Sequence, residues 1–198
     1  QTINLLKRRG AAMQNALPNG EGGMLAILGQ TIENINSILK ENEKKFICYI
    51  ANDNSNGQIV LSGKKINLEL LSEILIKKNI KFVKLPVSAP FHCSLMKPAA
   101  EKMEKKINST VFQNPKIELV SNVTAKSTNN SNEIKNLLIK QISSKVRWRE
   151  SVLFMIKNQV NEFIEIGPGK VLSGLIKRID DKVLSKSINT IEDIKNLK

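Results

Sequence analysis

The order of the predicted strands and helices constrains the fold of this chain more than any other feature of its sequence. Between residues 20 and 87 the apolar pattern predicts strands at 23–29, 46–51, 58–62 and 81–87, and helices at 32–40 and 68–78. The polar run at 52–57 predicts a turn, so the strands on either side of it should form a hairpin. The order strand, helix, strand, strand, helix, strand is that of a ferredoxin-like unit.

The second half of the chain has a different pattern of apolar residues. It predicts helices at 95–107, 133–142 (capped by Asn132), 149–158 and 171–179, a polar loop at 124–132, and strands at 116–122, 162–166 and 183–188. Strands that alternate with helices indicate a largely parallel sheet covered on both faces. The first ten residues have the pattern of a helix from the same layer. We therefore expect residues 1–19 and 88–198 to form part of a larger α/β domain, into which residues 20–87 are inserted.

Length and composition indicate an ordinary globular protein. The chain has 198 residues, enough for one large or two small domains with a real core. No apolar run is long enough to cross a bilayer, so we expect no membrane association. The two cysteines suggest neither a disulfide framework nor a zinc site, and a reducing cytoplasm is the simplest compartment. The chain begins at Gln1 without a signal-peptide layout, and we expect it to be a fragment that starts inside a fold.

The formal net charge of +13 suits an acidic partner. The excess is mostly lysine, which is scattered along the chain, and aromatic residues make up only 4%. No RNA-binding aromatic motif is present, so we do not expect nucleic acid as the partner.

His92 is the one histidine of the chain, and it lies on the predicted connection between a strand and a helix. Its imidazole is the one side chain whose ordinary pKa lies near neutral pH, which makes it the first candidate for a general base. The alternative is a structural histidine whose ring nitrogens are satisfied by the fold. Cys93 is adjacent, but neighbouring side chains generally point apart, so we expect no Cys93–His92 dyad.

No convincing nucleophile accompanies His92. A Gly-x-Ser-x-Gly elbow, which exposes a serine on a sharp turn, is absent, because the runs at 61–63 and 172–174 lack the first glycine. The residues alone therefore indicate a base without a nucleophile.

Two further features could bind an anion. Arg9 precedes Gly10 at the end of a predicted helix and could hold a carboxylate through two parallel hydrogen bonds, or it could be an exposed charge at a helix end. The turn 167–169 (Gly-Pro-Gly) could offer backbone N–H groups to an anion, or it could be a tight turn that only glycine fits.

Several segments, in chain order, resemble the malonyl-CoA:acyl-carrier-protein transacylases of type II fatty-acid synthesis. They are Arg-Arg-Gly-Ala-Ala-Met-Gln at 8–14, the run from Leu85 to Glu101 around Ser-Ala-Pro-Phe-His-Cys, the segments 120–123 and 141–148, and Glu-Ile-Gly-Pro-Gly-Lys-Val-Leu at 165–172. The hairpin at 52–63 is similar to the family's Asn-x-Asn-Ser-x-Gly-Gln turn. The resemblance implies an α/β-hydrolase-like acyltransferase domain with an inserted ferredoxin-like subdomain.

The resemblance also implies an activity and residue roles. The activity is transfer of a malonyl group from malonyl-CoA to the phosphopantetheine thiol of acyl carrier protein, through a serine-bound acyl-enzyme, in fatty-acid biosynthesis. His92 matches the catalytic histidine, and Gln141 matches the residue whose backbone carbonyl orients it. Arg9 matches the arginine that pairs with the malonyl carboxylate. Phe91 matches the bulky neighbour that favours malonyl over branched acyl groups.

The sequence departs from the family's pattern in one respect. The Gly-His-Ser-Leu-Gly elbow and the Gly-Gln-Gly motif are absent, and we expect them before Gln1, so this polypeptide alone should not form an acyl-enzyme. We expect no cofactor and no metal, and a monomer when full length. An acidic carrier protein would fit the positive charge. A polyketide-synthase acyltransferase domain and a non-catalytic basic module that binds an acidic partner are the alternatives.

Overall fold

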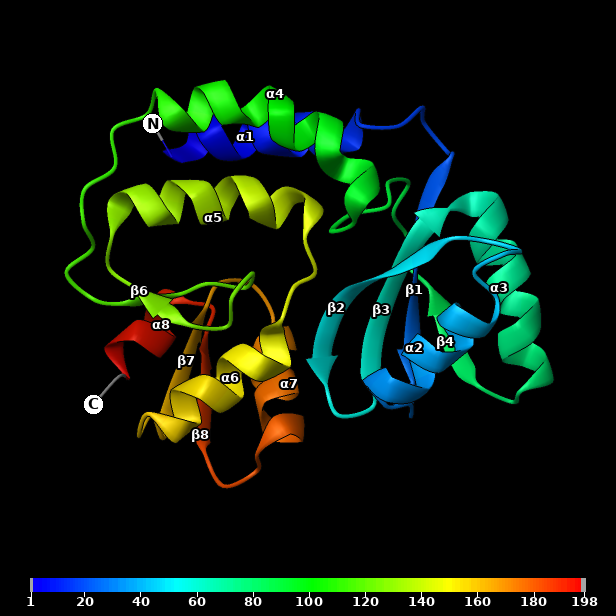
Figure 1. The fold of residues 1–198 in the computed structure, drawn as a ribbon. Helices are drawn as coiled ribbons and strands as arrows, with labels where there is room; N and C mark the ends of the chain where they lie inside the picture. The colour runs from blue at the N-terminus through cyan, green and yellow to red at the C-terminus, as the bar shows by residue number, and fades with distance from the viewer. Residues whose placement is uncertain (1, 197–198) are drawn as a thin grey trace.

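The computed structural model describes residues 2–196. A four-stranded sheet with two helices stands beside a larger group of helices that contains a short parallel strand pair (Figure 1). The strands of the first unit are β1 (Gly22–Leu28), β2 (Cys48–Ser55), β3 (Gln58–Lys64) and β4 (Lys81–Lys84), and its helices are α2 (Ile32–Glu41) and α3 (Lys65–Lys77). The strands lie in the order β2-β3-β1-β4, and every neighbouring pair is antiparallel. The predicted order of strands and helices is therefore confirmed.

Strand β1 is buried on both faces. Leu25 and Ile27 pack with α2 and α3 on one face of the sheet. Met24 and Ala26 point to the opposite face, because successive side chains of a strand alternate. Partly buried side chains between Leu85 and Phe91 cover that second face, so the sheet supports the segment that leads to His92.

Three helices of the second unit lie side by side: α1 (Thr2–Gln14), α4 (Lys97–Asn108) and α5 (Ser131–Ser143) (Figure 1). They share a core that includes Met13, Met96, Met103 and Ile142. The short helix η1 (Ser94–Met96) leads into α4.

Three helices and two strands lie on the other side of α5. They are α6 (Trp148–Lys157), β7 (Glu162–Ile166), α7 (Val171–Ile179), β8 (Leu184–Ile188) and α8 (Ile191–Lys195). Strands β7 and β8 are parallel, and Val152, Phe163 and Ile176 form the core between them and the helices.

The prediction of a large parallel sheet is wrong for the described residues. Among their named strands, only β7 and β8 pair in parallel. The strand predicted at 116–122 is reduced to β5 (Leu119–Val120). It pairs antiparallel with β6 (Ser127–Thr128), which lies inside the predicted loop. Ile117 is 83% exposed, and Ile166, at the end of β7, is 81% exposed. An apolar run forms a long strand only where a neighbouring strand accepts its hydrogen bonds and packs on its side chains.

Several predicted boundaries also move; the strand predicted at 81–87, for example, ends at Lys84. Helix α1 continues through Gly10 to Gln14, so Arg9 lies inside the helix and not at its end. Asn130, and not Asn132, caps α5, because its side chain accepts hydrogen bonds from the backbone N–H groups of residues 132 and 133. Strand β2 extends to Ser55 with two register irregularities, and the turn is confined to residues 56–57. Pairing with β3 overrides the turn preference of the asparagines.

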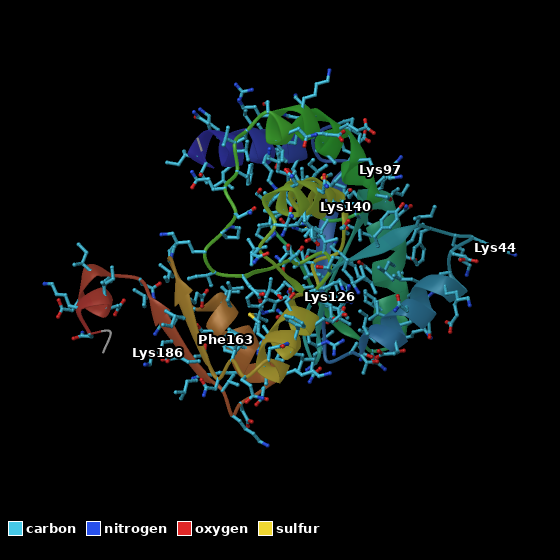
Figure 2. All side chains as sticks on the ribbon, turned by 60° about the vertical axis from the view of Figure 1, so that its left-hand side comes forward. Lys44, Lys97, Lys126, Lys140, Phe163 and Lys186 are labelled. Carbon is cyan, nitrogen blue, oxygen red and sulfur yellow. The ribbon has the colours of Figure 1, made fainter. Side chains whose placement is uncertain are left out.

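The positive charge is spread over the surface. Figure 2 labels five exposed lysines that come from separate elements or loops: Lys44, Lys97, Lys126, Lys140 and Lys186. Within residues 2–196, no helix has both the length and the apolar character of a membrane span.

Candidate active site

A cavity of about 450 Å³ lies where β2 meets α1, α5, the start of α6 and α7. Three predicted site residues that are far apart in the sequence line this cavity: Arg9, His92 and Gln141. The other lining residues are polar asparagines and large apolar side chains: Asn52, Asn54, Asn122, Leu6, Leu138, Val146, Trp148, Leu172 and Leu175. None of these described lining residues carries a hydroxyl or thiol group.

The backbone conformation at His92 and a hydrogen bond to Gln141 orient the imidazole ring. His92 has a φ of 58°, in the left-handed region that a non-glycine residue adopts only when its surroundings require it. Its Nδ1 lies 3.1 Å from the backbone carbonyl oxygen of Gln141. Because a carbonyl only accepts, this bond requires a proton on Nδ1 and leaves the Nε2 lone pair free to take another proton. The arrangement is that of a general base with an orienting partner.

The surroundings of His92 keep its ring neutral. Burial is the largest influence and lowers the pKa of His92, and the nearby charge of Arg9 lowers it further. The hydrogen bond to Gln141 acts in the opposite direction. The net result is a pKa below the ordinary value for histidine, so the imidazole is free to accept a proton at neutral pH.

Arg9 presents a cation to the same cavity. It lies one helical turn after Leu6 on α1, and both residues line the cavity. Burial lowers the pKa of Arg9, but a guanidinium stays charged at neutral pH. None of the ion pairs among residues 2–196 includes Arg9. The guanidinium is therefore available to an anionic ligand.

Cys93 and Phe91 flank His92 but point elsewhere. The Cys93 thiol is buried and donates to the carbonyl oxygen of Pro90 at 3.1 Å. Phe91 packs against the core of α1, α4 and α5 and against the second face of the sheet. Neither residue is among those that line the cavity, so the role of Phe91 in acyl selectivity stays a prediction.

The turn 167–169 offers little to an anion. The Glu165 carboxylate accepts from the backbone N–H groups of Leu172 at 3.0 Å and Ser173 at 2.8 Å, and the Asn189 side chain accepts from Gly169 at 2.6 Å. The bonds from Ser173 and Leu172 also lower the pKa of Glu165. Gly167 and Gly169 have φ of 140° and 98°, which favour glycine. The structure therefore supports the tight-turn interpretation.

Sequence reasoning did not assign the other nine residues of the cavity wall to the site, and four of these have polar side-chain groups: Asn52, Asn54, Asn122 and Trp148. The first two were assigned to a turn. Their spacing of two residues is also the spacing of side chains on one face of a strand, and it could have indicated that β2 continues. Asn122 and Trp148 were noticed only as members of the segments 120–123 and 141–148, without a role in the site.

Comparisons with known proteins give a consistent result, although no family model matches the sequence. The chain is 40% identical to malonyl CoA-acyl carrier protein transacylase of Bacillus subtilis (strain 168) over 194 residues, which are 97% of this chain and 61% of the relative. The protein of the same name from Staphylococcus aureus (strain MSSA476) is 40% identical over 195 residues, which are 98% of this chain and 63% of the relative. The chain thus spans about three fifths of the length of these curated relatives.

Solved structures show the same similarity. An acyl-carrier-protein-S-malonyltransferase from Bartonella henselae superposes with a TM-score of 0.94 at 39% identity, over 98% of this chain and 62% of that chain. A malonyl-transacylase in complex with its type II PKS acyl-carrier protein superposes with a TM-score of 0.92 at 37% identity, over 98% of this chain and 63% of that chain. The resemblance drawn from the sequence motifs is confirmed by these relatives.

Proposed function

We propose that this chain, a homologue of the malonyl CoA-acyl carrier protein transacylases, supplies the base and the carboxylate clamp of a malonyl transferase. The reaction moves a malonyl group from malonyl-CoA to the phosphopantetheine thiol of acyl carrier protein, in fatty-acid biosynthesis. One observation carries the proposal. A cavity holds both an imidazole with a free Nε2, oriented by the Gln141 carbonyl, and a guanidinium with no carboxylate partner among residues 2–196.

In the first half-reaction His92 Nε2 takes the proton of a serine hydroxyl. The serine oxygen attacks the malonyl thioester carbonyl, the bond to sulfur breaks, and the imidazolium returns its proton to the leaving thiolate of CoA. In the second half-reaction His92 takes the proton of the phosphopantetheine thiol. The thiolate attacks the ester, and the serine oxygen leaves and regains the proton. Arg9 holds the free carboxylate throughout, and no cofactor is needed.

The serine of this mechanism is not among the described residues that line the cavity. We place it in the part of the relatives that this chain does not span. The chain by itself should therefore bind malonyl-CoA without forming the acyl-enzyme.

The finer features of the fold also belong to the proposal. Residues 20–87 would be a ferredoxin-like subdomain, supported by the antiparallel order β2-β3-β1-β4 and the helices α2 and α3. Residues 1–19 and 88–198 would be part of an α/β-hydrolase-like domain. We propose a cytoplasmic enzyme, monomeric when full length, whose net charge of +13 attracts an acidic carrier protein.

A chimera tests the function. The part of the Bacillus subtilis relative that this chain does not match is joined to the chain in the relative's order, and labelled malonyl-CoA is added. The chimera should take up one malonyl group per molecule and pass it to acyl carrier protein, and the chain alone should take up none.

Two variants of the chimera separate the roles. His92→Ala should abolish transfer, whereas Gln141→Ala should retain most of it, because the backbone carbonyl remains. Full transfer by the His92→Ala chimera, or stoichiometric label on the chain alone, contradicts the proposal. A chimera that melts cooperatively but takes no label contradicts it too and favours a non-catalytic basic module.

A further inference from the structure

We propose that the ion pair between Asp53 and Arg149 is a positioning element. It holds the wall of the cavity and, through residues 144–147, the end of α5 that carries Gln141. This inference rests on the proposed function, because the cavity it positions is the one assigned to malonyl transfer. Neither residue was singled out by the sequence motifs.

The ion pair is well formed and mostly buried. Arg149 Nε donates to both carboxylate oxygens of Asp53, at 3.0 and 3.1 Å, and Arg149 Nη2 donates to Oδ2 at 2.9 Å. The side chain of Asp53 is only 2% exposed, and that of Arg149 is 25% exposed. Asp53 lies on β2 in the small sheet and Arg149 in the first turn of α6, so the pair joins the two units.

Backbone contacts reinforce the same junction. The N–H of Asp53 donates to the carbonyl of Val146 at 2.9 Å, and the N–H of Val146 donates to the carbonyl of Ala51 at 2.8 Å. This short parallel bridge adds a neighbour to the edge of β2. The two register irregularities of β2 lie between residues 50 and 52 and between residues 53 and 55, on either side of the bridge.

The irregular part of β2 carries cavity residues. Asn52 and Asn54, the two neighbours of Asp53, line the cavity with His92, while the Asp53 side chain is buried toward Arg149. Irregularities of this kind commonly redirect side chains near active sites. Trp148, the neighbour of Arg149, lines the same cavity. Each partner of the ion pair is therefore adjacent to a residue of the cavity wall.

The junction also reaches His92 through α5. Gln141 lies in the last turn of α5, where carbonyl groups lack partners within the helix, so its carbonyl is free to accept from His92. Between the end of α5 and the start of α6 only residues 144–147 intervene. Val146 holds that segment to β2, and the Arg147 N–H donates to the Asn122 carbonyl at 2.9 Å. Loosening Arg149 should therefore loosen the segment that fixes the Gln141 carbonyl.

A buried ion pair is a poor source of stability, because the loss of hydration offsets the attraction between the charges. Apolar residues of similar size often replace such a pair without loss of stability, whereas removal of one partner leaves a buried charge unpaired. This difference separates a positioning role from a structural one.

The test uses the double variant Asp53→Leu/Arg149→Met, with Arg149→Met and Arg149→Lys beside it. Glu162→Gln is the matched control, since it removes a carboxylate from the exposed pair with Lys186 at 2.8 Å. The chain has one tryptophan and one histidine, and both line the cavity, so each gives an unambiguous signal in dilute solution. The signals are the emission maximum of Trp148 and the ¹⁵N chemical shifts that report which nitrogen of His92 carries the proton.

We expect the double variant to melt within a few degrees of the parent but to differ at the site. The Trp148 emission should shift to the red, and the neutral His92 ring should lose its exclusive Nδ1–H form. In the chimera, kcat should fall about 10- to 100-fold while KM for malonyl-CoA stays within about twofold. Arg149→Lys, which keeps the charge but not the paired geometry, should give smaller changes of the same kind.

The inference is overturned if the double variant melts like the parent and keeps the parent's Trp148 emission, His92 proton position and kcat. If the double variant does not fold, Arg149→Lys decides by the same measurements. The spectroscopic signals do not depend on malonyl transfer. An active His92→Ala chimera would therefore refute the proposed function while these signals still judge the ion pair.

Discussion

Replacing Arg9 by alanine should weaken the binding of malonyl-CoA and leave the binding of acetyl-CoA nearly unchanged. The two ligands differ by the free carboxylate that the guanidinium is proposed to hold. Arg9 lines the cavity beside His92 and has no ion-pair partner among residues 2–196, so its loss removes no contact that an acetyl group would use.

The magnitude follows from the partial burial of Arg9. Two opposite charges about 4 Å apart attract by about 4 kcal/mol at an effective dielectric constant of about 20. Loss of carboxylate hydration offsets part of this, and about 3 kcal/mol remains, which is roughly a 100-fold change in the dissociation constant. Acetyl-CoA should change by no more than about threefold, as for a substitution that removes no specific contact.

Quenching of Trp148 fluorescence provides the assay. The single tryptophan lines the same cavity, so titration of the 198-residue chain with each CoA ester gives both dissociation constants. Arg8→Ala is the matched control, since it removes an exposed arginine from the neighbouring position on α1. Arg9→Lys should recover part of the loss, because the ammonium keeps the charge without the paired geometry.

Equal weakening of both esters by Arg9→Ala would refute the clamp. So would an Arg8→Ala variant with the same selective effect, because the selectivity would then come from the general positive field of the chain. In the chimera, kcat/KM for the two esters should diverge by the same factor as the dissociation constants.

Three further results are expected. The transfer rate of the chimera should rise with pH, with an apparent pKa below the ordinary value for histidine, because burial and the charge of Arg9 both favour the neutral His92 ring that acts as base. In Arg9→Ala this apparent pKa should be higher than in the parent. A lower apparent pKa in that variant contradicts the assignment. The chain alone should bind a hydrophobic dye and self-associate as its concentration rises, because Ile166 and Ile117 are 81% and 83% exposed. Light scattering and dye fluorescence measure this, and a monodisperse sample that binds no dye contradicts it. Phe91→Ala should raise kcat/KM for branched acyl-CoA esters relative to malonyl-CoA and lower the melting temperature, since the ring packs against two cores; an unchanged ratio removes Phe91 from the selectivity of the site.

The sequence alone predicted the elements that local pattern determines. The alternating and helical apolar periods located β1, α2, β3, α3, α6, β7 and α7 to within a few residues. His92 was placed on a connection between a strand and a helix for the same reason, and the family resemblance supplied its partners, Arg9 and Gln141. Periodicity is a property of neighbouring residues, so it can be read without knowledge of the fold.

Tertiary structure decided the features that depend on contacts between distant segments. Strand β2 passes through a run of asparagine and aspartate because β3 and Val146 pair with it. Within the described chain, only Leu119 and Val120 of the 116–122 run form a strand, with β6, and β7 pairs only with β8, so the large parallel sheet expected there is absent. The Gln141 carbonyl at 3.1 Å from His92, the Asp53–Arg149 pair and the cavity wall all join residues more than forty positions apart. Local sequence preferences do not depend on such contacts. Only the folded chain could therefore show that His92 meets the Gln141 carbonyl and the Arg9 guanidinium in one cavity.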